Sequence, residues 1–113
     1  MSEPRADDLL PLPAAVFHIL VALAERDGHG YSIMQDVAER ARIRLSPGTL
    51  YTSIRKMLEQ GLISELRHAP DPENDDPRRR YYRLTKFGRQ VARAEAARFA
   101  DLVRQARETG LAL

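Results

Sequence analysis

The chain has 113 residues, of which 43% are hydrophobic and 30% are charged, and its formal net charge is +2. This length suits one domain with a modest core. Cysteine is absent, which excludes disulfides and thiolate chemistry. No apolar run reaches the roughly 20 residues of a membrane-spanning helix, and the apolar stretch 14–24 lacks the basic flank of a signal peptide. We therefore expect a cytoplasmic protein that does not contact a membrane.

The charge is unevenly distributed along the chain. Residues 1–77 carry 8 basic and 13 acidic groups, a net of −5, whereas residues 78–113 carry 10 basic and 3 acidic groups, a net of +7. A basic end on a nearly neutral chain predicts a surface that meets a polyanion. A long helix with many exposed arginines would also account for part of this charge.

The first third of the chain predicts an arm and two helices. Residues 1–11 are expected to form a flexible N-terminal arm. A helix over about 13–26 is apolar nearly all round, which predicts burial on more than one side and contact with a partner subunit. His18 on this helix is interpreted as a packed or interfacial residue and not as a ligand. Residues 27–30 form a turn before a helix over 31–41, and residues 42–45 are expected to be an extended segment that closes a small sheet.

Residues 46–63 predict a short, sharply bounded helix that leads into a strand. Ser46 is a good N-cap, Pro47 suits the first helical position, and Gly61 occupies the position of a left-handed C-terminal cap. One face is an apolar stripe of Leu50, Ile54, Met57 and Leu58. The opposite face carries Thr49, Tyr51, Thr52, Arg55 and Lys56.

A basic hairpin follows this helix. Two strands are predicted over 62–68 and 78–85, joined by the segment 69–77, which contains three prolines and four acids and predicts a mobile loop. In the second strand Tyr82 and Leu84 share the face that points to the core. Arg78 and Arg79 then lie near the tip of the hairpin, within reach of phosphate. A solvated arginine run is the alternative interpretation.

The last predicted helix begins after Thr85, which caps it, and runs from Lys86 to about Thr109. In a monomer Phe99, Leu102 and Val103 would have little to cover them, so we expect a dimer contact with the first helix of a partner. The residues predicted at this interface are Val16, Phe17, Leu20, Val91, Phe99, Leu102, Val103 and Ala106.

Catalytic and metal-binding patterns are missing from the sequence. The histidines are scattered without zinc spacing, and the acids at 71–76 lack the order and the glycine of an EF-hand loop. No Ser/His/acid set and no phosphate-cradling glycine loop occurs. The sequence therefore predicts no enzyme, no metal and no cofactor.

Four separated motifs resemble those of PadR-type transcriptional regulators. They are His-Gly-Tyr-Ser-Ile at 29–33, Leu-Ser-Pro-Gly-Thr-Leu-Tyr at 45–51, Glu-Gln-Gly-Leu-Ile at 59–63 and Arg-Tyr-Tyr-Arg-Leu-Thr-Lys-Phe-Gly-Arg at 80–89. The resemblance runs from about residue 12 to residue 108. It implies a winged helix-turn-helix, a dimer built with the C-terminal helix, repression of nearby genes and, in some members, release from DNA by small aromatic or amphipathic ligands. A single C-terminal helix leaves room for a small pocket at the dimer interface, near Phe17, Phe99 and Val103.

The sequence thus predicts a mainly α fold with a small β-hairpin, in which residues 12–85 form a winged helix-turn-helix and residues 86–113 a C-terminal dimerisation helix. The expected function is sequence-specific binding of a double-stranded DNA operator by a homodimeric repressor that a small ligand can release. The alternative is a winged-helix protein–protein adaptor that does not bind DNA. The predicted DNA-binding residues are Tyr31, Ser46, Gly48, Thr49, Tyr51, Thr52, Arg55, Lys56, Arg78, Arg79 and Arg80.

Overall fold

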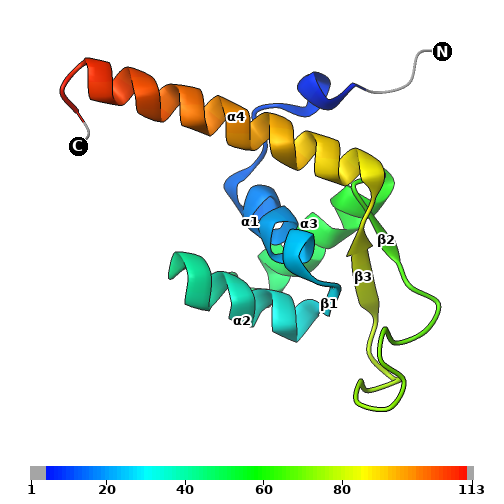
Figure 1. Cartoon of the computed structure of the whole chain (residues 1–113). Coiled ribbons are helices and arrows are strands. Elements are labelled where there is room, and N and C mark those ends of the chain that lie inside the picture. Colours follow the sequence, from blue (N-terminus) through cyan, green and yellow to red (C-terminus); the bar gives the residue numbers. More distant parts are fainter. Residues whose placement is uncertain (1–4, 112–113) are drawn as a thin grey trace.

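A computed structural model describes residues 5–111 of the chain as helices around a small sheet (Figure 1). The elements are η1 Ala6–Leu9 (a 3₁₀ turn), α1 Ala14–Glu25, β1 Gly28–His29, α2 Gly30–Ala41, α3 Pro47–Glu59, β2 Ile63–Glu65, β3 Tyr81–Leu84 and α4 Lys86–Glu108. This arrangement confirms the predicted fold class, a mainly α winged helix with a long final helix. Residues 1–4 of the predicted arm and residues 112–113 of the predicted final helix lie outside the described residues.

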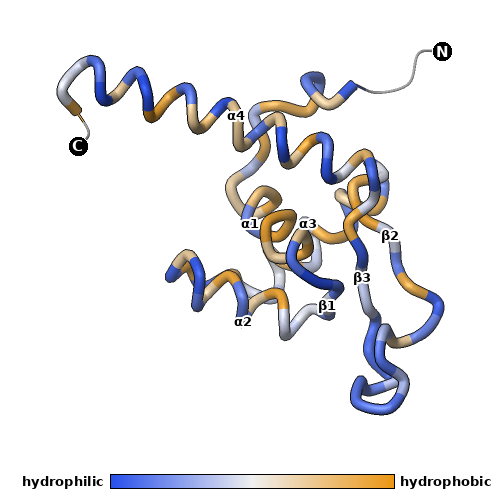
Figure 2. Tube along the Cα trace, in the orientation of Figure 1, coloured by the Kyte–Doolittle hydropathy of each residue, from blue (hydrophilic) through white to orange (hydrophobic). Residues whose placement is uncertain are grey.

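Helix α1 lies at the centre of the fold and contacts α2, α3, α4 and β3. Figure 2 shows it as hydrophobic along nearly its whole length. Ile19 and Leu20 are fully buried, and Leu50 and Met57 of α3 are fully buried against the same core. One side of α1 is therefore covered by its own chain, whereas Phe17 and Val21 on another side are only partly buried. Burial of a side chain of this size contributes about 1.5–3 kcal/mol to folding.

The sheet has the order β1-β3-β2, and both pairs are antiparallel. The two residues of β1 pair with Tyr82 and Tyr81 of β3, so the turn predicted at 27–30 supplies the third strand. The prediction that residues 42–45 close the sheet was wrong. Arg42 ends α2 in the left-handed conformation (φ 56°) and its amide bonds the Ala38 carbonyl, which directs the chain toward α3 and away from the sheet.

The predicted ends of α3 are confirmed. The Ser46 side chain accepts a hydrogen bond from the Thr49 amide, and Gly61 adopts a positive φ of 74° after the last turn. The Leu62 amide then bonds the Met57 carbonyl at 2.9 Å, as in a Schellman motif. One residue of the predicted apolar stripe departs from it, because Leu58 is 37% exposed.

The start of α4 is clamped to the end of α3. Thr85 caps α4 by accepting from the Gly88 amide at 2.9 Å, and its hydroxyl lies within hydrogen-bond distance of the Gly61 and Leu62 carbonyls. Gly88 is buried against the Leu62 backbone, and a Cβ there would overlap the Leu62 carbonyl oxygen. Only glycine lets the two backbones approach this closely.

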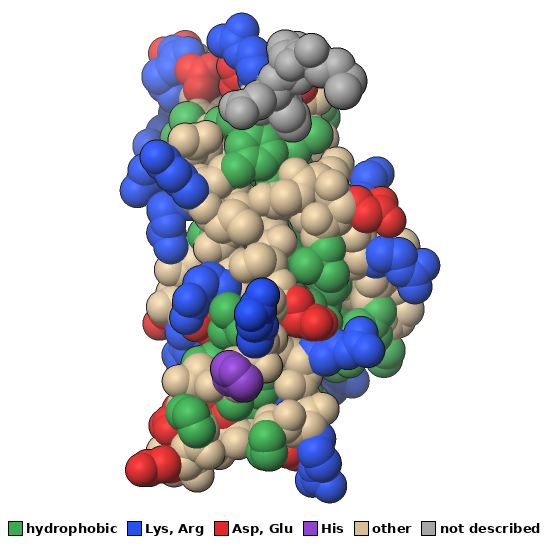
Figure 3. All heavy atoms as spheres, turned by 90° about the vertical axis from the view of Figure 1, so that its right-hand side faces the viewer, with side chains coloured by type: hydrophobic (Ala, Val, Ile, Leu, Met, Phe, Trp, Pro, Cys, Tyr) green, Lys and Arg blue, Asp and Glu red, His purple; other side chains and the backbone are tan. Residues whose placement is uncertain are grey.

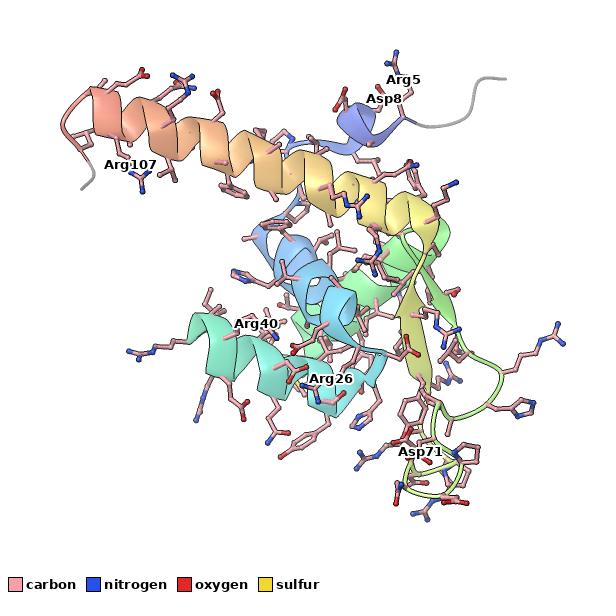
Figure 4. The ribbon with its side chains drawn as sticks, viewed as in Figure 1. Arg5, Asp8, Arg26, Arg40, Asp71 and Arg107 are labelled. Carbon is pink, nitrogen blue, oxygen red and sulfur yellow. The ribbon has the colours of Figure 1, made fainter. Side chains whose placement is uncertain are left out.

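The segment before α1 packs along α4, although the sequence predicted a flexible arm over residues 1–11. η1 contacts α4, and the Leu12 amide donates to the buried Glu95 carboxylate at 2.8 Å. Arg98 donates to the other oxygen of Glu95, and this bond holds the pKa of the carboxyl below its ordinary value. Asp8 lies in η1 beside α4, and Arg5 directly precedes this turn (Figure 4).

The second half of α4 projects beyond the rest of the molecule (Figure 1). Phe99, Leu102 and Val103 are 40%, 52% and 45% exposed, and Phe99 stacks on Phe17 of α1 with ring centroids 5.3 Å apart. Three residues of the predicted dimer interface do not lie on this surface. Val16, Leu20 and Val91 are buried within the core of their own chain, so they cannot present a surface to a partner.

We predict that Gly88→Ala strongly destabilises the fold, because the added Cβ would meet backbone that cannot rotate away. The expected loss is about 3 kcal/mol or more of unfolding free energy in urea titration. Gly48→Ala is the matched control: nothing lies within 4 Å of its Cβ, so stability should be unchanged or rise by up to about 1 kcal/mol. Equal stabilities of the two variants would contradict the close approach at Gly88.

Candidate nucleic-acid interface

The start of α2, the first half of α3 and the wing, which comprises β2, β3 and the loop 66–80 between them, meet around one open pocket of about 310 Å³. Four predicted site residues are brought together there from three separate segments. They are Tyr31, Tyr51, Arg79 and Arg80. The remaining lining residues are His29, Gly30 and Tyr82.

Tyr51 reaches from α3 to the start of α2. A Cβ on Gly30 would lie 2.6 Å from the Tyr51 hydroxyl, so the absence of a side chain at residue 30 makes room for this ring. Tyr51 remains 51% exposed, and Tyr31 beside it is 60% exposed. The two tyrosines therefore form the walls of the pocket and also keep much of their surface open to a partner.

The exposed face of α3 continues beyond this pocket. Ser46, Gly48, Thr49, Thr52, Arg55 and Lys56 are all exposed. Ser46 and Thr49 bond each other at the N-terminus of the helix. Arg55 and Lys56 form no ion pair with the described residues, so their charges are available to a partner.

The wing arginines differ in their surroundings. Arg78 makes two side-chain hydrogen bonds of 3.2 Å to Asp76, which raise the pKa of its guanidinium and locally neutralise its charge. Arg80 lies a loose 3.9 Å from Glu65. Pairs this exposed contribute little, so Arg80 remains available to an anion. Arg79 turns back and approaches Nε2 of His29 at 2.7 Å.

The loop between β2 and β3 has internal order. Asp71, at the far end of the wing in Figure 4, accepts from the Asn74 side chain at 2.7 Å and from the Glu73 amide at 3.2 Å. These bonds lower the pKa of Asp71. The sequence predicted a mobile loop here. Instead, acidic side chains such as that of Asp71 accept hydrogen bonds from the backbone of the loop itself.

His29 links the wing to α2, and its role was not predicted from the sequence. Its Nδ1 faces the Ser32 amide at 3.3 Å as a cap of α2, while Nε2 faces Arg79. A neutral imidazole accepts at one nitrogen only, so the two donors compete for it, and a protonated ring can accept from neither. Burial and the Arg79 charge lower the pKa of His29, partly opposed by Asp75 and Asp76.

Tyr82 was assigned to the core from the alternation of its strand. The structure places its ring there, but Tyr82 also lines the pocket. Strand alternation predicts that Tyr81, next to Tyr82, faces away from the core, but Tyr81 is also buried, with its ring edge-on to His29 at 5.3 Å. Period-two alternation could not reveal this, because both faces of this short strand are covered.

Within residues 5–111, no three His, Cys, Asp or Glu side chains come together in a way that could hold a metal ion. None of the helices described there is long and apolar enough to cross a membrane.

Comparison with known proteins agrees with the winged-helix geometry. Residues 19–94 match the transcriptional regulator PadR-like family. The chain is 33% identical over 93 residues to the transcriptional regulator Rv3488 of Mycobacterium tuberculosis, covering 81% of each chain. A PadR family transcription regulator of Clostridium difficile superimposes with a TM-score of 0.75 at 24% identity, over 86% of this chain and 98% of that one. A PadR-like transcription factor of Bacteroides fragilis gives a TM-score of 0.67 at 22% identity, over 83% and 87%.

The fold and the exposed helix α3 define a winged-helix protein. With the family match over most of its length, this chain belongs to the PadR-like family of transcriptional regulators. It is therefore a transcriptional regulator and not an enzyme.

We predict that His29 makes folding sensitive to pH near its ordinary pKa of 6.5. Its pKa is lower in the folded chain, so the unfolded chain takes up the proton first as pH falls. Stability that is present above pH 6.5 should then be lost as pH falls through the lower folded pKa. His29→Asn keeps a capping side chain but does not titrate. Urea unfolding at several pH values should show a smaller loss of unfolding free energy at low pH for this variant than for the wild type. If stability depends on pH in the same way in both proteins, His29 is not the cause.

Proposed function

We propose that this chain is a sequence-specific DNA-binding regulator that acts as a repressor in the cytoplasm. The supporting observation is that the α2 start, Tyr51 of α3 and the wing residues Arg79 and Arg80 converge around one pocket. Figure 3 views the face that carries the wing, where Lys and Arg side chains are spread widely and acidic side chains are fewer. A helix with a polar face beside a basic wing suits the major groove and its flanking phosphates.

The proposed division of labour follows from side-chain chemistry. Arg55 and Lys56, with Thr49 and Thr52, would meet base edges, since Arg and Lys bond guanine and hydroxyls bond several bases. Wing residues and the α2 start would hold phosphates, which fixes register without reading sequence. Arg78, already paired with Asp76, would contribute less than its charge suggests.

We further propose that two copies associate through α4. Phe99, Leu102 and Val103 form an exposed apolar strip on a projecting helix, and Phe17 and Ala106 adjoin it as partly buried residues. Such a strip on a long helix suits pairing with the same surface of another copy. A dimer would present two α3 helices to two half-sites, which raises affinity for a symmetric operator.

A small amphipathic ligand has a place to bind in this proposal. A groove of about 200 Å³ lies between α1 and α4 and is almost entirely apolar. Phe17, Val21 and Leu84 line it, and Arg89 and Arg93 are also at its wall. Apolar walls with nearby cations suit an aromatic or aliphatic molecule with an acidic group. A ligand there would contact the helix that we propose holds the dimer together.

The alternative, an adaptor that binds only proteins, has less support. It explains neither Arg55 and Lys56 on α3, which form no ion pair within residues 5–111, nor the arginines beside the α2 start. Binding of the purified protein to the DNA upstream of its own gene, at a stated salt concentration, separates the two functions. Saturable binding that random DNA does not compete away supports the regulator.

We expect Arg55→Ala to weaken specific binding by about 1–3 kcal/mol if this residue bonds a base edge. Thermal stability should barely change, since the side chain is exposed. Arg40→Ala removes the same charge from the far end of α2, outside both the pocket and the α4 strip, and serves as the control. Anisotropy titrations on specific and random DNA are the measurement. Equal losses on both DNAs would make Arg55 a phosphate contact.

Leu102→Asp combined with Val103→Asp should convert the proposed dimer into a folded monomer. Both side chains are about half exposed, so the change should leave the core intact while placing charge in the proposed interface. Sedimentation gives the mass, and circular dichroism verifies the fold. The matched control is Gln90→Asp with Ala97→Asp, which adds the same two charges at exposed positions of α4 outside the strip and the groove. If the Leu102→Asp, Val103→Asp variant remains a dimer, the strip on α4 is not the dimer interface.

A further inference from the structure

The Tyr82 side chain is buried but its hydroxyl has no partner among the described residues. The residue is 4% exposed, and its ring belongs to the hydrophobic core. No polar side-chain atom in residues 5–111 is both sealed from solvent and without a hydrogen bond, so this hydroxyl reaches the pocket that Tyr82 lines. A nearly buried hydroxyl is unfavourable when its hydrogen bond is not made. Its position therefore suits a partner that enters from outside.

The surroundings of this hydroxyl favour an anion. Arg79 and Arg80 line the same pocket, and no carboxylate does. The Glu65 carboxylate lies 3.9 Å from the Arg80 guanidinium, which makes only a weak ion pair. Gly30 and Tyr31 bring the N-terminus of α2 to the pocket, where the helix end carries partial positive charge. The pocket therefore offers donors and positive charge from three directions.

The hydroxyl also remains a donor. Burial, with the nearby Glu65 carboxylate, raises the pKa of Tyr82, so the phenol keeps its proton across the physiological range. The core holds the ring in place, so a bond from its hydroxyl costs little further side-chain entropy. Tyr51, whose hydroxyl lies against the space left by Gly30, adds a second phenol without a partner among the described residues.

We propose that this pocket binds a single phosphate group, with the Tyr82 hydroxyl as a fixed hydrogen-bond donor and Arg79 and Arg80 as the charges that attract it. Guanidinium groups with a hydroxyl donor suit the several oxygens of a phosphate. This inference rests on the proposed function, because the pocket lies where DNA would run past the wing and the α2 start. In the complex the phosphate is a backbone phosphodiester, although a free phosphate offers the same chemistry.

The test compares two substitutions that each remove one oxygen atom. Tyr82→Phe should weaken DNA binding roughly tenfold, as expected for a lost hydrogen bond to a charged group. Its melting temperature should not fall, since the hydroxyl bonds nothing within the described chain. Tyr81→Phe is the matched control, because Tyr81 is the equally buried neighbour outside this pocket, and its affinity should equal that of the wild type.

A scan of methylphosphonates, which neutralise one DNA phosphate at a time, then locates the contact. At one position the affinity penalty should be smaller for Tyr82→Phe than for the wild type, because part of the interaction is already lost. If both phenylalanine variants bind as the wild type does, the phosphate pocket is wrong and the DNA-binding function stands. If the wild type binds no DNA, the proposed function itself fails.

A titration of the free protein with inorganic phosphate, followed through the tyrosine ring resonances, distinguishes free phosphate from a DNA backbone phosphate as the ligand of the pocket. Shifts of Tyr82 that saturate, together with competition against DNA, would show that the pocket takes phosphate on its own. Coupling of Tyr82 to one methylphosphonate without such shifts would assign the site to the DNA backbone. The absence of both effects overturns the proposal.

Discussion

The contact between Gly88 and the Leu62 backbone is the constraint on which the arrangement of the molecule depends. It joins the end of α3 to the start of α4 without an intervening side chain, and the Thr85 hydroxyl bonds the same turn. Because Gly61 and Leu62 also close α3, one short segment sets where α3 ends, where β2 begins and how α4 leaves. The direction of α4 therefore depends on that of α3, and a displacement of one helix should displace the other.

The middle strand β3 has a comparable double role. It pairs with both neighbours in the sheet, and Tyr82 contributes its ring to the core and its hydroxyl to the pocket. The packing that stabilises the domain therefore also orients a polar atom on its surface. His29, on the paired strand β1, contacts both the Tyr81 ring and the Arg79 guanidinium. The geometry of the wing and the protonation of one imidazole are thus coupled.

The features that were predicted most reliably from the sequence are those that depend on residues close together in the chain. The caps at Ser46, Gly61 and Thr85 depend on residues a few positions apart, and each lies as predicted. The third strand was misplaced because strand pairing joins distant segments, and two residues at 28–29 carry no periodic pattern. Likewise, no local feature marks Glu95 as the partner of the Leu12 amide, 83 residues away. In the candidate site, the exposed tyrosines and arginines could be predicted from the sequence. The roles of His29 and of the Tyr82 hydroxyl became evident only from their neighbours in space.

The ion pairs along the projecting half of α4 have a consequence for assembly. Arg104 bonds Asp101 at 2.6 Å and Glu108 at 2.7 Å, one turn to either side. Each exposed pair contributes only about 0.3–0.5 kcal/mol, but both act where no other element supports the helix and so oppose fraying. Two chains that meet through this segment would then dock helices that are already formed. Their encounter would not bear the entropy of folding a disordered tail, so a preorganised α4 favours fast pairing at low protein concentration.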